Sequence, residues 1–429
     1  MSAPFETEGG LRFRNGGKVV HNGCMSETKK ISVIIPAFNC VEFFPQCIDS
    51  LLVQTFDDFE IIVVDDGSTD GTYELAQHYA DAHDHVRVLR QNHQFAGTAR
   101  NLGLSMAQGE YVIFLDGDDY FEPTLLEDAL RRIQETDADV CVFGAHWLND
   151  KTGEVKPMNN ACRADLCPPA TFNRVTNPRY IFCFTTPAPW TKMFRRSFIE
   201  SNRLIFQETR SANDLRFVFS ALAVADRITT LDERLVVYRR QNASSLQSTQ
   251  HKDPLAFFTA LTSLRDELKN RGVFEQVSHA YVNAALDMCM YNLRTLSHNR
   301  ETQRKIFEFL KTEGFKELEL ENKPRDYFYV YPTSRYDDFL VVQNGTFEDY
   351  VAHLSGKSSK GLKARLKKTA RSVIPVRASV FEKSKRDLQK ELDLIKEQNR
   401  NLEDKLNAVL EEIHELKRRE PDAENTSEQ

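Results

Sequence analysis

The first half of the chain is predicted to form an α/β fold with a mostly parallel sheet, and three observations support this. Short apolar runs rich in β-branched residues recur from residue 31 to residue 145, which is typical of strands buried on both faces. Segments whose apolar residues have helical spacing separate these runs. Two of the runs end in clustered aspartates. Since ligands bind at the carboxyl ends of the strands in such sheets, the aspartates indicate a functional site.

The predicted elements alternate as strand and helix along the chain. Pro36 stops the first apolar run, and the segment after it places apolar residues at helical spacing from Phe44 to Leu52. Gly67 and Gly71 form a turn between the second run and a polar helix. The predicted strands span residues 31–39, 59–66, 86–91, 111–115 and 139–145. The predicted helices lie within residues 41–56, 67–83, 97–108 and 123–135.

The whole chain of 429 residues divides into six predicted segments. Residues 1–29 are Gly-rich and polar and are expected to be a flexible leader, and residues 30–250 form the α/β domain. The pattern of residues 251–356 is mainly helical. A basic amphipathic linker follows at 357–378, then a coiled coil at 379–420 and a disordered tail at 421–429.

Composition excludes several classes of protein. The net charge of −7 argues against a general nucleic-acid binder, because such proteins need excess cation to displace counterions from phosphates. The eight cysteines are scattered, without a Cys-x-x-Cys pair, and are expected to be reduced thiols. No run approaches the ~20 apolar residues of a spanning helix, and the first 30 residues contain no apolar signal core. A cytoplasmic protein is therefore expected.

The segment Asp116-Gly117-Asp118-Asp119 follows the apolar run at residues 111–115. Hard divalent cations such as Mg²⁺ commonly bind through one or two carboxylates together with the phosphates of a substrate. Gly117 would let backbone and ligand approach closely, because it has no Cβ. An acidic turn or a helix N-cap before Pro123 explains the same residues equally well. The segment alone leaves both interpretations open.

A second acidic segment, VVDDGSTDGT at residues 63–72, also follows a buried run. Its aspartates are suited to accept hydrogen bonds from the base or ribose of a nucleotide. The alternative is an ordinary loop between strand and helix in which Thr69 or Asp70 caps the helix. Two acidic strand ends in one parallel sheet favour a nucleotide site.

Five motifs, in this order, resemble the family-2 inverting glycosyltransferases of GT-A fold, a Rossmann-like architecture: SVIIPAFN, FEIIVVDDGSTDGT, GTARNLGL, GEYVIFLDGDDY and PAPWTKMFRR. The match covers roughly residues 30–245, and the agreement of five separated motifs makes it specific. The resemblance implies a metal-dependent transfer from a UDP-sugar with Mn²⁺ or Mg²⁺. It also assigns roles to particular residues.

The roles implied by the resemblance concern the donor. Pro36, Ala37 and Asn39 would line the nucleotide pocket, Asp66 would receive the uracil ring, and Arg100 and Asn101 would face the nucleotide-sugar, with Gly117 beside it. Asp116 and Asp118 would form the Asp-x-Asp element, in which one carboxylate contacts the ribose or sugar and the other holds the metal. Asp119 would share the metal role, and the sequence leaves open which carboxylate is the direct ligand.

An inverting transfer also needs a base that removes the proton of the acceptor hydroxyl. Many relatives carry a Glu-Asp pair before a helix at this place, whereas this chain has Asn213-Asp214. The base is therefore assigned to Asp214, with Glu208 as the second choice. Helix capping ahead of Leu215 is the alternative role for Asp214.

Residues after the acidic segments are interpreted as acceptor-side groups. Trp190 would stack on a sugar ring and Lys192 would meet a phosphate, although burial of Trp190 in the core is nearly as well supported. Arg239 and Arg240 follow another apolar strand, where one of them would reach the diphosphate. Exposure on the surface is the alternative for both.

The C-terminal part carries two further patterns. Apolar residues from 388 to 416 alternate four and three apart, and Asn399 falls at heptad position a, which favours a parallel homodimer. The stretch from Lys357 to Arg377 contains eight Lys or Arg residues and no acid, with apolar residues at roughly helical spacing. Peripheral contact with an anionic membrane and a solvated linker explain this stretch about equally well.

The sequence thus predicts a cytoplasmic hexosyl- or N-acetylhexosaminyltransferase, which would lie at the inner face of the cell membrane if the basic stretch binds lipid. Its acceptor, by family analogy, is a surface glycan, a teichoic-acid-type polymer or a glycoprotein. A nucleotidyltransferase would use similar carboxylates but release diphosphate instead of UDP. An inactive transferase domain that acts as a coiled-coil scaffold is the other alternative.

Overall fold

The computed structural model describes residues 29–240, 252–321, 323–329 and 334–356. The predicted leader up to residue 28, the basic linker and the coiled coil lie outside these residues. The chain forms two compact units. The first contains the residues up to 249 together with 263–277, and the second contains 250–262 together with the residues from 278 onward. The main segment of the first unit thus ends one residue before the predicted boundary at residue 250, and residues 263–277 belong to the same unit.

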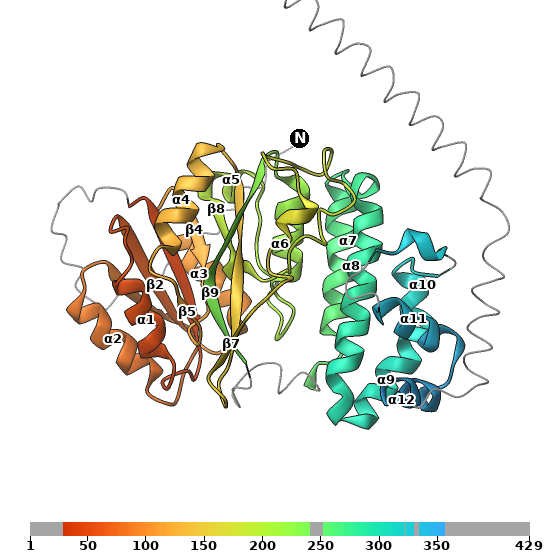
Figure 1. Cartoon of the computed structure of the whole chain (residues 1–429). Coiled ribbons are helices and arrows are strands. Elements are labelled where there is room, and N and C mark those ends of the chain that lie inside the picture. Colours follow the sequence, from red (N-terminus) through yellow and green to blue (C-terminus); the bar gives the residue numbers. More distant parts are fainter. Residues whose placement is uncertain (1–28, 241–251, 322, 330–333, 357–429) are drawn as a thin grey trace, which may run out of the picture. The chain divides into compact units, whose positions relative to one another are not determined.

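The first unit is built on one mixed sheet (Figure 1), with the strand order β3-β2-β1-β4-β8-β6-β9-β5 and with β7 paired to β6. The strands β1, β2, β3 and β4 are mutually parallel where they pair, whereas β8 runs antiparallel to both of its neighbours. Strand β6 pairs with β9 in parallel and with β7 antiparallel. The strands are β1 Ile31–Ala37, β2 Phe59–Asp65, β3 Val86–Arg90, β4 Tyr111–Phe114, β5 Tyr120–Phe121, β6 Val140–Asn149, β7 Glu154–Pro157, β8 Lys192–Arg195 and β9 Ile228–Arg240.

All five strands predicted from the sequence are present. One helix lies in each connection between β1, β2, β3 and β4. The helices of the first unit are α1 Phe44–Leu52, α2 Thr72–Ala82, α3 Phe95–Met106, α4 Leu125–Glu135, α5 Arg196–Ser201 and α6 Leu215–Val224. Pro45 lies in the first turn of α1, where its missing N–H costs no helical hydrogen bond. The mixed α/β sheet with its covering helices fits a GT-A domain, with three antiparallel strands, β5, β7 and β8, that the sequence did not predict.

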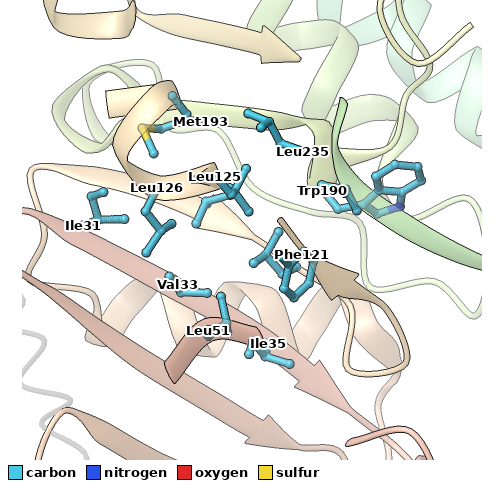
Figure 2. Close-up of a cluster of buried hydrophobic side chains, with 14 of the residues drawn as sticks. Ile31, Val33, Ile35, Leu51, Phe121, Leu125, Leu126, Trp190, Met193 and Leu235 are labelled. Carbon is cyan, nitrogen blue, oxygen red and sulfur yellow. The ribbon is translucent and has the colours of Figure 1, made fainter. Parts of the chain in front are cut away.

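Opposite faces of β1 pack against different helices, because successive side chains of a strand point to opposite sides. Figure 2 shows one face, where Ile31, Val33 and Ile35 lie among side chains of α1 and α4. On the other face α3 approaches closely at Gly103, where a Cβ would stand 2.5 Å from Cγ2 of Ile34. Strands covered on both faces explain the continuous apolar runs of the sequence.

The second unit is helical in its described part. Helix α12 contacts both α9 and α11, and it begins with a capping box between Thr346 and Asp349. A buried carboxylate, Asp338, receives Arg294 of α8 and His353 of α12. The helices from residue 256 onward are α7 Ala256–Asn270, α8 Phe274–Thr295, α9 Arg300–Phe309, α10 Phe315–Glu317, α11 Ser334–Asn344 and α12 Phe347–Leu354. Within the described residues, none of the helices combines the length and apolarity needed to cross a membrane.

Candidate active site

The two acidic segments lie at the same edge of the parallel sheet. Asp65 and Asp66 come at the end of β2, and Asp116 follows β4. Both strands pair in parallel with β1, so a single strand separates the two acidic ends. The topology therefore places the two acidic strand ends near each other, as predicted. The role of each carboxylate depends on its hydrogen-bond and ionic partners.

Arg100 of α3 connects the acidic segment after β4 with the segment before α6. Its guanidinium donates to Oδ1 of Asp116 at 2.6 Å and to Oδ1 of Asn213 at 3.0 Å. The side chain is only 5% exposed and also lies over the ring of Phe206. Arg100, Asp116 and the Asn213-Asp214 pair thus belong to one charged network, although they are far apart in the sequence.

Asp214 precedes the first residue of α6 and its side chain makes no capping hydrogen bond there. Burial raises the pKa of the Asp214 carboxyl, the charge of Arg100 opposes this rise, and the charge of Asp116 adds to it. A carboxyl with a raised pKa accepts a proton more readily near neutral pH, as a general base requires. Ala212, two residues before it, has a positive φ of 53°. By contrast Glu208, the second choice for the base, is exposed.

Asp119 is turned into the protein. It is 1% exposed, and its Oδ1 accepts a hydrogen bond from the backbone N–H of Arg239 in β9 at 2.8 Å. Among the described residues its Oδ2 has no hydrogen-bond partner. Burial, and then the charges of Asp118 and Asp116, raise the pKa of the Asp119 carboxyl well above its usual range. This burial speaks against the expected direct contact of Asp119 with a metal.

Arg239 has a more central place in this region than the sequence analysis predicted. Its Nε donates to the carbonyl of Asp118 at 2.8 Å, and its guanidinium also reaches Asp150 and Gln46. It lies over the ring of Phe43 as well. Arg239 therefore holds the backbone of the acidic segment in place and is not the exposed cation that was the alternative. Arg240 is exposed.

Asp66 has four hydrogen-bonding or ionic neighbours at its carboxylate. Oδ1 accepts from Nε2 of Gln91 and from the N–H of Gln94, while Oδ2 accepts from the N–H of Phe95 and lies 2.8 Å from Nδ1 of His93. The residue is 2% exposed. Its acceptor capacity is full, so in this structure Asp66 fixes residues 91–95 and does not offer an oxygen to uracil. Phe95, the first residue of α3, has a positive φ of 70°, which is unusual for a bulky side chain.

The loops after β1 and β2 hold each other by backbone contacts. Asn39 has a positive φ of 48°, its N–H donates to Oγ of Ser68, and its Oδ1 accepts from the N–H of Thr69. Ala37 is buried and its carbonyl accepts from the N–H of Asp66, while Pro36 pairs in register with Val64. These three residues shape the edge of the sheet at which a nucleotide was expected.

Gly117 and Asn101 serve the packing of the protein. A Cβ at Gly117 would stand 3.3 Å from Sγ of Cys40, so the absent side chain permits close contact with the loop after β1. The side-chain amide of Asn101 exchanges two hydrogen bonds with the backbone of Phe206, at 3.0 and 2.9 Å. Asn101 therefore pins the segment before α6, which corrects the expectation that it faces the donor.

The two residues predicted to meet the acceptor are both in the interior. Trp190 belongs to the apolar core and stacks on Tyr238 with ring centroids 5.2 Å apart. Lys192 is fully buried, and its Nζ donates to oxygens of residues 185, 186, 188 and 191 at 2.8 to 3.0 Å. Burial lowers the pKa of Lys192 to about 7. Neither side chain can touch an acceptor in this structure, because Trp190 is packed in the core and the ammonium group of Lys192 is bound by the preceding loop.

Sequence reasoning missed an aromatic pair at the same edge. Phe38 is 43% exposed and stacks on His93 with ring centroids 4.1 Å apart and an interplanar angle of 21°. His93 in turn contacts Asp66 and the edge of the Phe95 ring. A large aromatic residue directly after the buried end of β1 was the signal in the sequence that would have pointed to Phe38.

The carboxylates after β4 fit a divalent cation only together with oxygens from a substrate. Within the described residues, no group of three or more His, Cys, Asp or Glu side chains is arranged to hold a metal ion. Arg100 occupies one oxygen of Asp116, and Asp119 is buried. A donor set of one or two carboxylates completed by phosphate oxygens is the usual one for Mg²⁺. Asp116 and Asp118 fit that set.

Comparison with known proteins gives a consistent result. The family model described as Glycosyl transferase family 2 matches residues 32–202. The chain is 34% identical to the uncharacterized glycosyltransferase EpsJ of Bacillus subtilis over 52% of this chain and 64% of that protein. It is 31% identical to the cholesterol galactosyltransferase of Borreliella burgdorferi over 59% of this chain and 71% of that protein. The chain thus spans less than two thirds of EpsJ.

A third relative is the poly(ribitol-phosphate) beta-N-acetylglucosaminyltransferase TarS of Staphylococcus aureus. The chain is 29% identical to TarS over 69% of its own length and 48% of that protein. The crystal structure of TarS residues 1–349 with UDP-GlcNAc has a TM-score of 0.48 and 23% identity, and covers 80% of this chain and 90% of that chain.

Proposed function

The chain belongs to glycosyl transferase family 2, and from this premise we propose that it is a metal-dependent, inverting glycosyltransferase. It transfers a hexosyl or N-acetylhexosaminyl group from a UDP-sugar to a hydroxyl group. One observation carries this proposal: the guanidinium of Arg100 joins the carboxylate of Asp116 to the segment that holds Asp214. A donor-side acid and a candidate base therefore belong to one network, as a transfer reaction needs.

The nucleotide is proposed to bind at the edge formed by the ends of β1 and β2. The exposed ring of Phe38, stacked on His93, offers a flat apolar surface to the base. Asn39 and Ser68 hold the two loops together beneath it. Asp66 contributes by fixing residues 91–95, including His93, and does not itself need a free oxygen for this role.

Asp116 and Asp118 are the residues proposed to hold Mn²⁺ or Mg²⁺ with the diphosphate. A cation held there would neutralise the negative charge that develops on the leaving UDP. Arg100 keeps one oxygen of Asp116 directed toward itself, so the carboxylate is oriented before any donor arrives. Asp119 is proposed to support this segment from within through the backbone of Arg239.

Asp214 is proposed to accept the proton of the acceptor hydroxyl. The hydroxyl oxygen forms a bond to the anomeric carbon while the bond from that carbon to UDP breaks on the opposite face, which inverts the configuration. The raised pKa of Asp214, caused first by burial, makes it a competent proton acceptor near neutral pH. Asn213, held by Arg100, positions Asp214 without adding a second negative charge.

The acceptor is proposed to be a polyol-phosphate polymer of the teichoic-acid type or another surface glycan. TarS acts, by its name, on poly(ribitol-phosphate), and the Borreliella relative is named for transfer of galactose to cholesterol. Because the names of these relatives give different acceptors, the shared family does not determine the class of acceptor. Glycoproteins remain within the proposed range.

Two further proposals concern residues outside the described part of the chain. We propose that the heptad pattern of residues 379–420 forms a parallel coiled-coil homodimer, and that the basic stretch 357–378 contacts anionic lipid. Light scattering after deletion of residues 380–420 tests the first, and an unchanged mass rules out this seam. Flotation of the full chain with and without anionic vesicles tests the second.

The function is tested by the release of UDP from a panel of UDP-sugars in the presence of Mn²⁺. We expect one or a few donors to be hydrolysed or transferred, and Asp214→Asn to abolish transfer while donor binding is retained. Asp232→Asn, an exposed acid on β9, is the matched control and keeps full activity. Release of diphosphate instead of UDP identifies a nucleotidyltransferase, and full transfer activity in Asp214→Asn removes the assignment of the base.

A further inference from the structure

A small cavity of about 120 Å³ lies beside α6, within the first unit. Its walls come from the segment before α6, from α6 itself and from the end of α7. Leucine, isoleucine and phenylalanine side chains form the apolar part of the lining, and the polar part consists of three arginines, one glutamate and one serine. A single buried water needs only ~10–15 Å³ of such space, so the cavity has room for a larger occupant.

The charge of the lining is positive. Arg271 is matched by Glu267, since its Nε lies 2.6 Å from Oε1 of that residue, and it also donates to the carbonyl of Asn202. This leaves Arg203 and Arg216 as two further cations. In the part of the chain that the structure describes, neither of these two side chains has a hydrogen bond or an ion pair. Two guanidinium groups that line one cavity without an acidic partner favour an anionic ligand.

A buried hydroxyl group lines the same cavity. Ser220 lies four residues after Arg216 in α6, so the two side chains are on one face of the helix. The residue is 2% exposed, and its Oγ has no hydrogen-bond partner among the described residues. Buried hydroxyl groups are normally hydrogen-bonded, and an unpartnered one indicates that an acceptor is missing. This observation is independent of the charge.

We propose that this cavity binds an oxyanion of the phosphate class, with Arg203 and Arg216 as charged donors and the hydroxyl of Ser220 as a neutral donor. Water satisfies the hydroxyl and hydrates the exposed Arg203, but it brings no negative charge to the two guanidinium groups, whereas a tetrahedral oxyanion supplies that charge and has acceptors for all three donors. Nothing in the donor-sugar chemistry at the ends of β2 and β4 requires this site. It is a second anion site, formed by different residues.

The site has a structural connection to the candidate base. Helix α6 begins directly after Asp214, and the segment before it is held to Asn101 by Phe206 and to Asn213 through the N–H of Gln207. An anion that bridges Arg203 and Arg216 therefore fixes both of the elements between which Asp214 lies. Its expected effect is to order the base segment.

Two sources supply this chemistry, namely a free phosphate ion and a phosphate group within a larger molecule. Calorimetric titration of the full chain with inorganic phosphate, in EDTA and at constant ionic strength, measures the first. Titration with dimethyl phosphate measures the second, because it models one link of a phosphodiester polymer. Saturable binding of either ion supports the site, and the stronger of the two identifies the source.

The variants are matched in pairs. Arg216→Gln is expected to weaken binding about tenfold or more, because a charge-assisted contact is lost. Ser220→Ala is expected to weaken it about threefold to tenfold, as for a neutral hydrogen bond. Arg234→Gln removes an exposed charge of β9, and Thr229→Val removes another buried Oγ without a partner in the described chain, so both controls retain the affinity of the parent chain.

Absence of saturable heat in the parent chain overturns the proposal, as does equal affinity in all four variants. Circular dichroism establishes that each variant is folded. If Arg216→Gln is unfolded, the comparison of Ser220→Ala with Thr229→Val decides the question alone. The titration contains no sugar nucleotide and no divalent cation, so its outcome is separate from that of the transfer assay.

Discussion

The acidic ends of β2 and β4 look alike in the sequence but differ in how their carboxylates are satisfied. At the end of β2, Asp66 has donors at both oxygens, and Asp65 accepts from the N–H groups of Gly67 and Ser68 and pairs with Arg90. At the end of β4, Asp116 has one strong partner, and Asp119 is buried with an unpartnered oxygen in the described structure.

The difference separates a structural role from a chemical one. Carboxylates whose oxygens already accept hydrogen bonds from backbone N–H groups fix a loop and have no acceptor capacity left for a ligand. At Asp119, burial first and then the neighbouring charges of Asp118 and Asp116 raise the pKa of the carboxyl. A cation relieves the repulsion between these charges, which is why the end of β4 is the stronger candidate for metal and diphosphate.

The largest expected effect is on activity at the β4 end. Asp118→Ala is expected to lower metal-dependent turnover of the UDP-sugar by about 10³-fold, because a ligand to the cation on the diphosphate is lost. Donor affinity should fall with it, and the melting temperature should stay near that of the parent chain. Mn²⁺-dependent UDP release and thermal denaturation measure the two. Parent-like turnover in this variant would place the metal elsewhere.

At the β2 end the expected effect is on stability. Asp66→Asn puts an amide NH₂ against backbone N–H donors and is expected to cost about 2–4 kcal/mol of unfolding free energy, since charged hydrogen bonds are lost and donors are left buried. Denaturant unfolding measures this cost. The exposed Asp84→Asn serves as the control and should be neutral. A parent-like stability of Asp66→Asn would mean that the two acidic ends do not differ in the way described.

Arg100 tests the connection between the β4 end and the base. Arg100→Gln is expected to slow transfer about 10- to 100-fold, because one amide cannot bridge Asp116 and Asn213 as a guanidinium does. Arg100 also opposes the raised pKa of Asp214, so its loss raises that pKa further. A base works only when ionised, so activity falls as pH drops through its pKa. The acidic limb of the pH–rate profile should therefore move to higher pH.

An unshifted acidic limb in Arg100→Gln would mean that Asp214 is not the group that titrates. The exposed Arg131→Gln, whose partners Asp128 and Glu135 lie on the same helix, is the control and should leave both the rate and the profile unchanged.

The smallest expected effect concerns the base-binding surface at the end of β1. Phe38→Ala is expected to weaken UDP binding about 5- to 50-fold, because stacking of a base on an aromatic ring is lost. Phe38→Tyr keeps the ring and should bind like the parent chain, as measured by calorimetry with UDP and Mn²⁺. Equal affinity of the alanine and tyrosine variants would move the base away from Phe38.

The parallel half of the sheet could be predicted because its information is local. Strands covered on both faces must be apolar throughout, and Ile31 to Ala37 and Phe59 to Asp65 carry that requirement in their own residues. The antiparallel strands give no such signal. Strand β5 has two residues, β7 is exposed along its length, and β8 begins with a buried lysine that a hydropathy pattern treats as polar.

The candidate site shows the same limit. The resemblance to the family's motifs identified Arg100, Asp116 and Asp214, and the structure brings these three into one network. The sequence could not show that the side chain of Asn101 is hydrogen-bonded to a residue 105 positions away, or that the carboxylate of Asp119 is hydrogen-bonded to one 120 positions away. A side chain that pairs over such a distance looks the same in the sequence as one that is free to bind.

The left-handed backbone at Phe95 links the two acidic ends mechanically. Asp66 grips the N–H groups of Gln94 and Phe95, and so sets the rotational phase at which α3 starts. Arg100 follows five residues later, about 7.5 Å along the axis and roughly 140° around it after one full turn. The carboxylate of Asp66 therefore helps to set the direction in which the guanidinium of Arg100 points, although Asp66 itself contacts no substrate in this arrangement. A small rotation of α3 about its axis would turn Arg100 away from Asp116.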